Sequence, residues 1–210
     1  MADTTTTRAL ARFALVAAAA VAAASLWAGS RPEQGLLLDA QTWQEEVVAA
    51  ATGPWPADGW YRIAPREQEV DVRAVQPTDA PADAGYALYL RLPGAALKTG
   101  VRAGYRNIAL LQQPATGKDY ELALGATRFR LRVDQGGEGT RYVIAYGGQT
   151  YSYLLGAPEA NTGVRAVADL DGDTQPDFLV EADDATYLLL STRARPGDNM
   201  PTAELAGRGC

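Results

Sequence analysis

The segment Arg128-Phe129-Arg130-Leu131-Arg132-Val133 alternates strictly between arginine and an apolar residue. Successive side chains of a β-strand point to opposite faces of the sheet, so this period of two predicts a strand over residues 128–133. We expect its three apolar side chains to face a core. The arginine row is interpreted as the wet face of the strand, paired with acids opposite, in preference to a binding surface for an anionic glycan or polyphosphate.

The chain around this segment reads as further strands separated by short turns. Residues 142–146 and 150–155 flank Gly147-Gly148, a dipeptide that favours a tight β-hairpin. Asp183-Asp184 is expected to turn another hairpin near the end of the chain. The remaining predicted strands are 60–63, 70–75, 86–92, 164–168, 178–182 and 186–190. Short strands joined by short turns indicate a mainly β fold, as an antiparallel sandwich, a barrel or a curved sheet.

One helix is expected in the exported part of the chain, over residues 39–51. Thr42 and Glu45 have the spacing of a capping box, and Gly53-Pro54 ends the periodic pattern. Trp43, Val47 and Ala50 fall on one face of this helix. We therefore expect the helix to pack that face on the β domain.

The first 28 residues have the composition of a secretory signal. Arg8 and Arg12 precede the Ala-rich stretch 13–27, and small residues follow it. The stretch is shorter than the ~20 residues of a spanning helix, so no stable membrane insertion is expected after cleavage. Cleavage is expected after Ala24 or Ala28, and the alternative is an uncleaved N-terminal anchor. The signal predicts a periplasmic or secreted protein, with a linker over 29–38 and a single domain over 39–210.

Composition excludes several classes of function. The formal charge of −6 argues against binding to nucleic acid, which is itself a polyanion. The chain has no His, which excludes Ser-His-Asp chemistry and His-ligated zinc. Its single Cys, Cys210, cannot form an intramolecular disulfide but is able to pair between chains. With no marked catalytic group, we expect no enzyme activity.

One segment carries the chemistry of a metal site: Asp169-Leu170-Asp171-Gly172-Asp173-Thr174-Gln175-Pro176-Asp177. Carboxylates stand at positions 1, 3, 5 and 9 of this loop, where they repel one another in the absence of a cation. Ca²⁺ takes about six to eight oxygen ligands, which alternate residues of a tight turn can supply. The loop is not an EF-hand, because it lacks Gly at position 6 and Glu at position 12.

With strand-like flanks and apolar residues after Asp177, the loop resembles the calcium loop of FG-GAP or VCBS repeats, which occur in integrin alpha chains and in exported bacterial proteins. The resemblance covers residues 164–182 in a single copy, and a multi-blade propeller is not expected. It departs from the family at Thr174, where Gly is usual; a left-handed backbone there would cost Thr energy and weaken calcium binding. The resemblance implies Asp169, Asp171, Asp173 and Asp177 as side-chain ligands and Gln175 as a carbonyl ligand.

The sequence thus predicts an exported, calcium-binding, non-enzymatic β protein that serves in binding or structural interaction, with a protein or glycan at the cell surface as its partner. Two alternatives stay open. One is a carbohydrate-active hydrolase that uses carboxylates alone. The other is an accessory subunit of a cell-surface complex.

Overall fold

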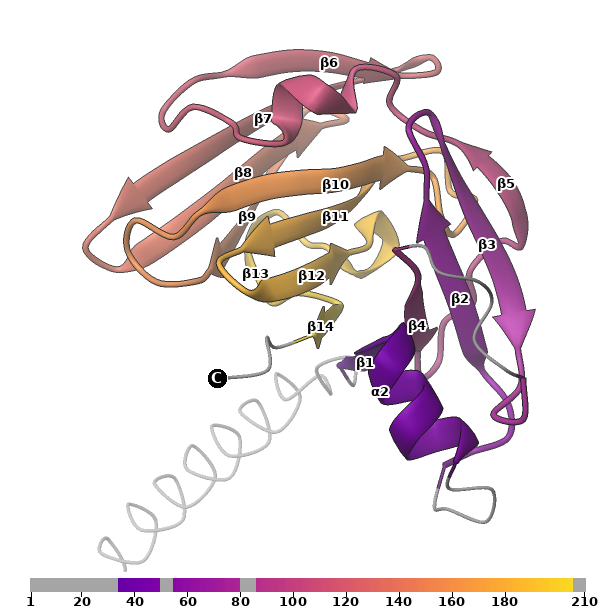
Figure 1. The fold of residues 1–210 in the computed structure, drawn as a ribbon. Coiled ribbons are helices and arrows are strands. Elements are labelled where there is room, and N and C mark those ends of the chain that lie inside the picture. Colours follow the sequence, from indigo (N-terminus) through magenta and orange to yellow (C-terminus); the bar gives the residue numbers. More distant parts are fainter. Residues whose placement is uncertain (1–33, 50–54, 80–85, 206–210) are drawn as a thin grey trace, which may run out of the picture. The chain divides into compact units, whose positions relative to one another are not determined.

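The computed structural model describes residues 34–49, 55–79 and 86–205. The predicted signal at 1–28, the first part of the predicted linker and Cys210 lie outside these residues. The described chain is mainly β, with one short helical segment near its start, which confirms the predicted fold class (Figure 1). Its strands form two sheets.

The larger sheet has nine strands and curves until its two edges nearly meet. Beyond the edge strand β5, Gly104 forms an antiparallel bridge with Ala168 of β10, the strand at the other edge. The neighbouring pairs are antiparallel, except that β1 and β14 are parallel. In sheet order the strands are β10 (Thr162–Ala168), β11 (Asp177–Ala182), β12 (Ala185–Leu189), β14 (Ala203–Leu205), β1 (Gly35–Asp39), β4 (Leu88–Arg91), β2 (Trp60–Pro65), β3 (Glu69–Val75) and β5 (Gly100–Ala103).

The smaller sheet contains the alternating segment that predicted the fold. That segment lies in β7, where Phe129, Leu131 and Val133 are buried as expected. Arg130 lies 3.8 Å from Asp119, a pairing with an acid of the kind expected for the row. In sheet order the strands are β13 (Gly197–Asn199), β9 (Gln149–Leu155), β8 (Gly139–Tyr146), β7 (Thr127–Gly136) and β6 (Tyr120–Leu124), with β13 parallel to β9.

Strands β10, β11 and β12 are buried on both faces because they separate two cores. Phe178 and Val180 of β11 pack with the apolar side chains of the smaller sheet, and Phe178 meets Phe129 edge to face at 5.6 Å. Leu179 points the other way, into the interior of the curved sheet. This two-sided burial explains why β11 reads as a continuous apolar run rather than an alternating one.

The helix begins with α2 (Ala40–Thr42) and continues as a π-helical segment, η1 (Trp43–Val48). Its cap is Asp39, whose side chain accepts the Thr42 N–H at 2.6 Å, so the predicted Thr42–Glu45 capping box is wrong. Trp43 and Val47 are buried as predicted, and Trp43 stacks on Tyr89 at 4.5 Å. Ala50 lies outside the described residues. Within the described part of the chain, no helix is long and apolar enough to cross a membrane.

Several short elements were not predicted. Residues 35–38, expected to be linker, form most of β1, a central strand of the larger sheet. Strands β5, β6, β13 and β14 were also missed. Each is short, and β13 and β14 join the sheets through partners far away in sequence. Two 3-10 turns complete the structure: η2 (Ile108–Leu111) and η3 (Ser191–Arg193).

Candidate metal centre

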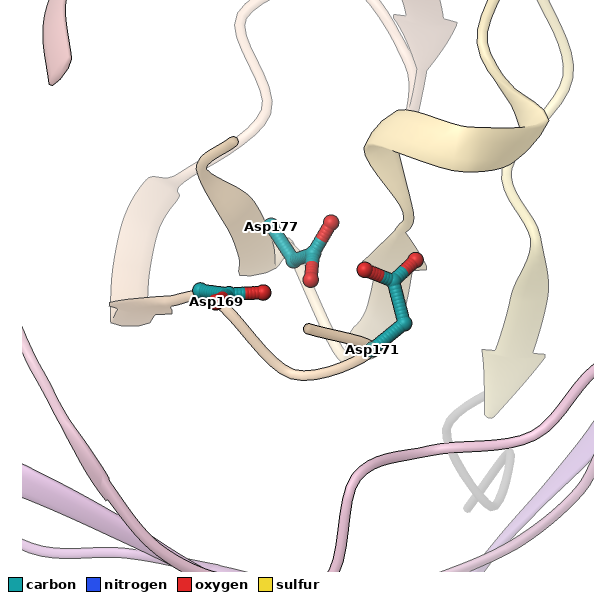
Figure 2. Close-up of side chains that lie close together, drawn as sticks. All are labelled: Asp169, Asp171 and Asp177. Carbon is teal, nitrogen blue, oxygen red and sulfur yellow. The ribbon is translucent and has the colours of Figure 1, made fainter. Parts of the chain in front are cut away.

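The Asp-rich loop connects β10 to β11 at one end of the curved sheet. Ala168 and Asp177 pair at its base, so the loop is closed where it leaves the sheet. The carboxylates of Asp169, Asp171 and Asp177 turn toward a shared space (Figure 2). One oxygen from each lies within 4.8 Å of the others, which brings together three of the five predicted ligands.

Asp177 forms the buried base of this cluster, with no exposed surface. Its carboxylate accepts the Leu170 N–H at 2.7 Å and both the N–H and the hydroxyl of Ser191 at 2.8 Å. Burial, and then the nearby charge of Asp171, raise the pKa of Asp177 to about 8. Burial also raises the pKa of Asp171. Ionising both Asp171 and Asp177 is therefore costly unless a nearby cation offsets the second negative charge.

The other carboxylates shape the backbone of the loop. Asp169 accepts the Gly172 N–H at 2.7 Å, and Asp173 accepts the Gln175 N–H at 2.7 Å. Thr174 between them has a φ of +72°, the left-handed conformation in which Thr is strained. Thr174 thus carries the conformational cost that a left-handed backbone at this position was expected to have.

Two hydroxyl groups that the sequence did not mark as site residues reach the loop from η3. The hydroxyl of Ser191 donates to Asp173 at 2.9 Å as well as to Asp177, and that of Thr192 donates to Asp171 at 2.6 Å. The sequence signal that could have located these two hydroxyl groups is the predicted hairpin at Asp183-Asp184. Its register pairs Phe178 with Leu189, which sets the residues after β12 beside Asp177.

A guanidinium from the opposite edge of the curved sheet also reaches the loop. Arg102 of β5 donates from Nη2 to the Asp169 carboxylate at 3.1 Å and from Nε to the Asp169 carbonyl at 2.8 Å. The repulsion expected among the four carboxylates is therefore partly offset by a side chain of the protein itself. Nothing in the sequence around Arg102 indicates this contact, which arises from closure of the sheet.

The donor set decides which ions the cluster suits. Asp169, Asp171 and Asp177 present carboxylate oxygens alone, the ligands preferred by hard cations such as Ca²⁺, Mg²⁺ and Mn²⁺. Asp173 is joined to the cluster through Ser191, and Gln175 is joined through its N–H bond to Asp173. The arrangement is able to bind a hard cation. Comparison of the chain with protein-family models, curated proteins and solved structures finds no match.

Proposed function

We propose that this chain is an exported, calcium-binding, non-enzymatic β protein, and that it serves in binding or structural interaction in the periplasm or outside the cell. In this proposal the loop at 169–177 binds one Ca²⁺, and the bound ion stabilises the fold. The observation that carries it is the position of the loop, where three separate parts of the structure meet around clustered carboxylates.

Each of these parts contributes a contact. Arg102 brings β5, from the far edge of the curved sheet, and η3 brings the hydroxyls of Ser191 and Thr192. Thr127 of β7, in the smaller sheet, donates its hydroxyl to the Thr174 carbonyl at 2.9 Å. A cation that orders this loop therefore stabilises the junction of both sheets and the start of the C-terminal segment.

The expected energy suits a structural ion in a calcium-rich compartment. Extracellular modules bind Ca²⁺ with dissociation constants of about 10⁻⁴–10⁻³ M. At about 1 mM calcium and a constant near 0.1 mM, binding adds roughly 1.4 kcal/mol to the free energy of unfolding. Such a weak site has little use in a cytosol that keeps calcium scarce, which links the loop to the predicted export.

The test compares the purified full-length chain in calcium and in chelator. We expect calorimetry to detect one calcium site, and the melting temperature to rise by about 2–8 °C in millimolar calcium. Asp171→Asn keeps the size of a ligand but removes its charge, and should abolish both effects.

Asp119→Asn is the matched control, because it also removes one carboxylate. Asp119 is half-exposed, pairs with Arg130 of the smaller sheet and lies outside the loop. This variant should leave calcium binding unchanged. The proposal fails if calcium neither binds nor raises the melting temperature, or if Asp171→Asn and Asp119→Asn behave alike.

A further inference from the structure

The outer face of the smaller sheet carries the arginine row, and its three guanidinium groups differ in their contacts. Arg132 donates from Nε to the Asp134 carboxylate at 3.0 Å, so its charge is paired. The acid beside Arg130 is Asp119, and the 3.8 Å between its carboxylate and Nε is too long for a hydrogen bond. Among the described residues, the exposed Arg128 side chain has neither an ion pair nor a hydrogen-bond partner. In this part of the chain, two neighbouring guanidinium groups thus keep their donors free for a ligand.

The strands on either side of β7 leave space beside these two arginines. Glu121 of β6 is directly opposite Arg130, yet within the described chain the two side chains form no ion pair. Ala123 is opposite Arg128, and Ala145 of β8 is opposite Arg130 on the other side. Alanine is depleted in strands, so these two positions add little to the stability of the sheet, and their small side chains leave room above it.

That room is a hollow of about 630 Å³, which we call the arginine groove. Its lining comprises residues 121–123, 128–130 and 145–150, and Gly147 and Gly148 add no side chain to it. The groove crosses four neighbouring strands from β6 to β9, and three strand spacings amount to about 14 Å. Its volume lies within the range of about 300–1,000 Å³ typical of small-molecule sites, and its length favours an extended ligand over a single small ion.

The free groups of the arginine groove favour an oxyanion. A guanidinium matches a carboxylate with two parallel hydrogen bonds, and the same donors bind other oxyanions such as sulfate. Arg128 and Arg130 are two positions apart on β7, so their Cα atoms are about 7 Å apart and their side chains share one face. These two arginines and the one acid, Glu121, give the lining a formal charge of +1, in a chain whose charge is −6. A positive hollow on an acidic protein directs an anion to this face.

The rest of the lining favours a sugar chain over an acidic peptide. Gln149 and Thr150 offer an amide and a hydroxyl, and within the described residues neither side chain has a hydrogen-bond partner. The large apolar residues of the lining, Leu122, Phe129 and Tyr146, are buried in the core between the sheets. They therefore present no apolar surface to a peptide side chain, whereas bound proteins and peptides depend on such buried anchors.

We propose that the arginine groove binds an acidic oligosaccharide, with its carboxylate or sulfate groups on Arg128 and Arg130 and its hydroxyl groups on Gln149 and Thr150. The inference names a ligand class for the binding role in the proposed function and rests on that role. It does not rest on calcium, because the groove shares no residue with the loop at 169–177.

The experiment titrates the full-length chain by calorimetry in chelator, because acidic sugars bind calcium themselves. Trigalacturonic acid supplies carboxylates, a heparin tetrasaccharide supplies mainly sulfates, and maltotriose is the neutral sugar. Tripolyphosphate and triglutamate supply negative charge without a sugar. We expect at least one acidic sugar to bind at least about tenfold more tightly than the three comparison probes, with an affinity that falls as salt is added. The better acidic sugar shows which oxyanion is recognised.

Arg128→Gln tests the assignment of the site. It should weaken binding by about tenfold or more and leave the melting temperature unchanged, because this exposed side chain has no partner among the described residues. Arg132→Gln is the matched control, because it removes the same charge from the same strand at a guanidinium that is paired with Asp134 and lies outside the groove. It should change the affinity by less than about threefold.

Two further variants change the groove while keeping both arginines. Ala145→Leu fills the hollow at constant charge and should weaken binding by about tenfold or more. Glu121→Gln removes the acid of the lining and should tighten binding by about twofold or more, a gain that misfolding does not produce.

The proposal is overturned if neither acidic sugar binds, if any comparison probe binds as tightly as the better acidic sugar, or if Arg128→Gln and Arg132→Gln weaken binding alike. The rise of the melting temperature in calcium, measured on the same preparation, tests the proposed function separately. A failure of the one is therefore distinguishable from a failure of the other.

Discussion

Arg102 holds Asp169 by two hydrogen bonds, from Nη2 to the carboxylate and from Nε to the carbonyl. Sixty-seven positions separate the two residues, and the contact exists because the curved sheet brings β5 back to the end of β10. A guanidinium in this position has two opposed consequences. It neutralises part of the carboxylate cluster, and it places a positive charge beside the ligands of the proposed cation.

The first prediction separates these two consequences with Arg102→Met. In chelator, the free energy of unfolding should fall by about 1–2 kcal/mol, because a partly buried, charge-assisted pair is lost. The affinity for calcium should rise, because the competing positive charge is gone. Urea denaturation in chelator and calcium calorimetry measure the two effects. Arg130→Met removes a half-exposed surface pair as a control, and should change stability by less than about 0.5 kcal/mol.

The second prediction concerns the backbone of Thr174, which has a φ of +72°. Thr174→Gly relieves a left-handed strain of about 1–2 kcal/mol, part of which is offset by the greater freedom of Gly in the unfolded chain. The Thr127 hydroxyl donates to the backbone carbonyl of residue 174, so this hydrogen bond remains in the Thr174→Gly variant. We expect a gain of about 0.5–1 kcal/mol in thermal or urea unfolding and tighter calcium binding. Thr150→Gly, at an exposed strand position of β9, should instead destabilise the protein.

The third prediction concerns alkaline pH and the buried Tyr142. Its hydroxyl donates to the Glu181 carbonyl at 2.6 Å and accepts the Gly163 N–H at 3.1 Å. Burial is the main cause that raises the pKa of Tyr142 above its ordinary value of 10. Above about pH 10 the unfolded chain therefore releases a proton that the folded chain keeps, and stability falls by up to about 1.4 kcal/mol per pH unit for this group.

Tyr142→Phe tests this linkage. At neutral pH the variant should be less stable by about 1–3 kcal/mol, because two buried backbone groups lose their partner. Between about pH 9.5 and 11 its stability should decline less steeply than that of the parent chain, as measured by urea denaturation at each pH. Curves that decline in parallel would contradict the assigned role of Tyr142.

The fourth prediction tests the two-sided burial of β11. Phe178→Ala should lower the free energy of unfolding by about 3–5 kcal/mol, because it opens a cavity between the two sheets where Phe129 packs. Leu154→Ala, at a side chain that is 47% exposed, is the control and should cost less than about 1 kcal/mol. Equal losses in urea denaturation would show that the sheets are not packed as described.

By itself the sequence determined the features that depend on local pattern. The strict alternation of residues 128–133 identified a half-buried strand, the Gly147-Gly148 and Asp183-Asp184 turns identified hairpins, and the spacing of aspartates identified the loop at 169–177. These signals lie within a few residues, where side-chain direction follows directly from the backbone period. The mainly β class follows from them.

Only the tertiary structure decided which distant segments meet. Short strands such as β1, β13 and β14 carry too few residues for a pattern, and they are ordered by pairing with strands far away in sequence. For the same reason, Arg102, Ser191 and Thr192 gave no local sign that they bind the loop. The hollow lined by Asp39, Tyr86, Glu181, Thr186 and Leu205 likewise exists only because the curved sheet brings residues of separate strands together. Such contacts depend on closure of the sheet, and this closure results from many weak strand pairings over the whole domain.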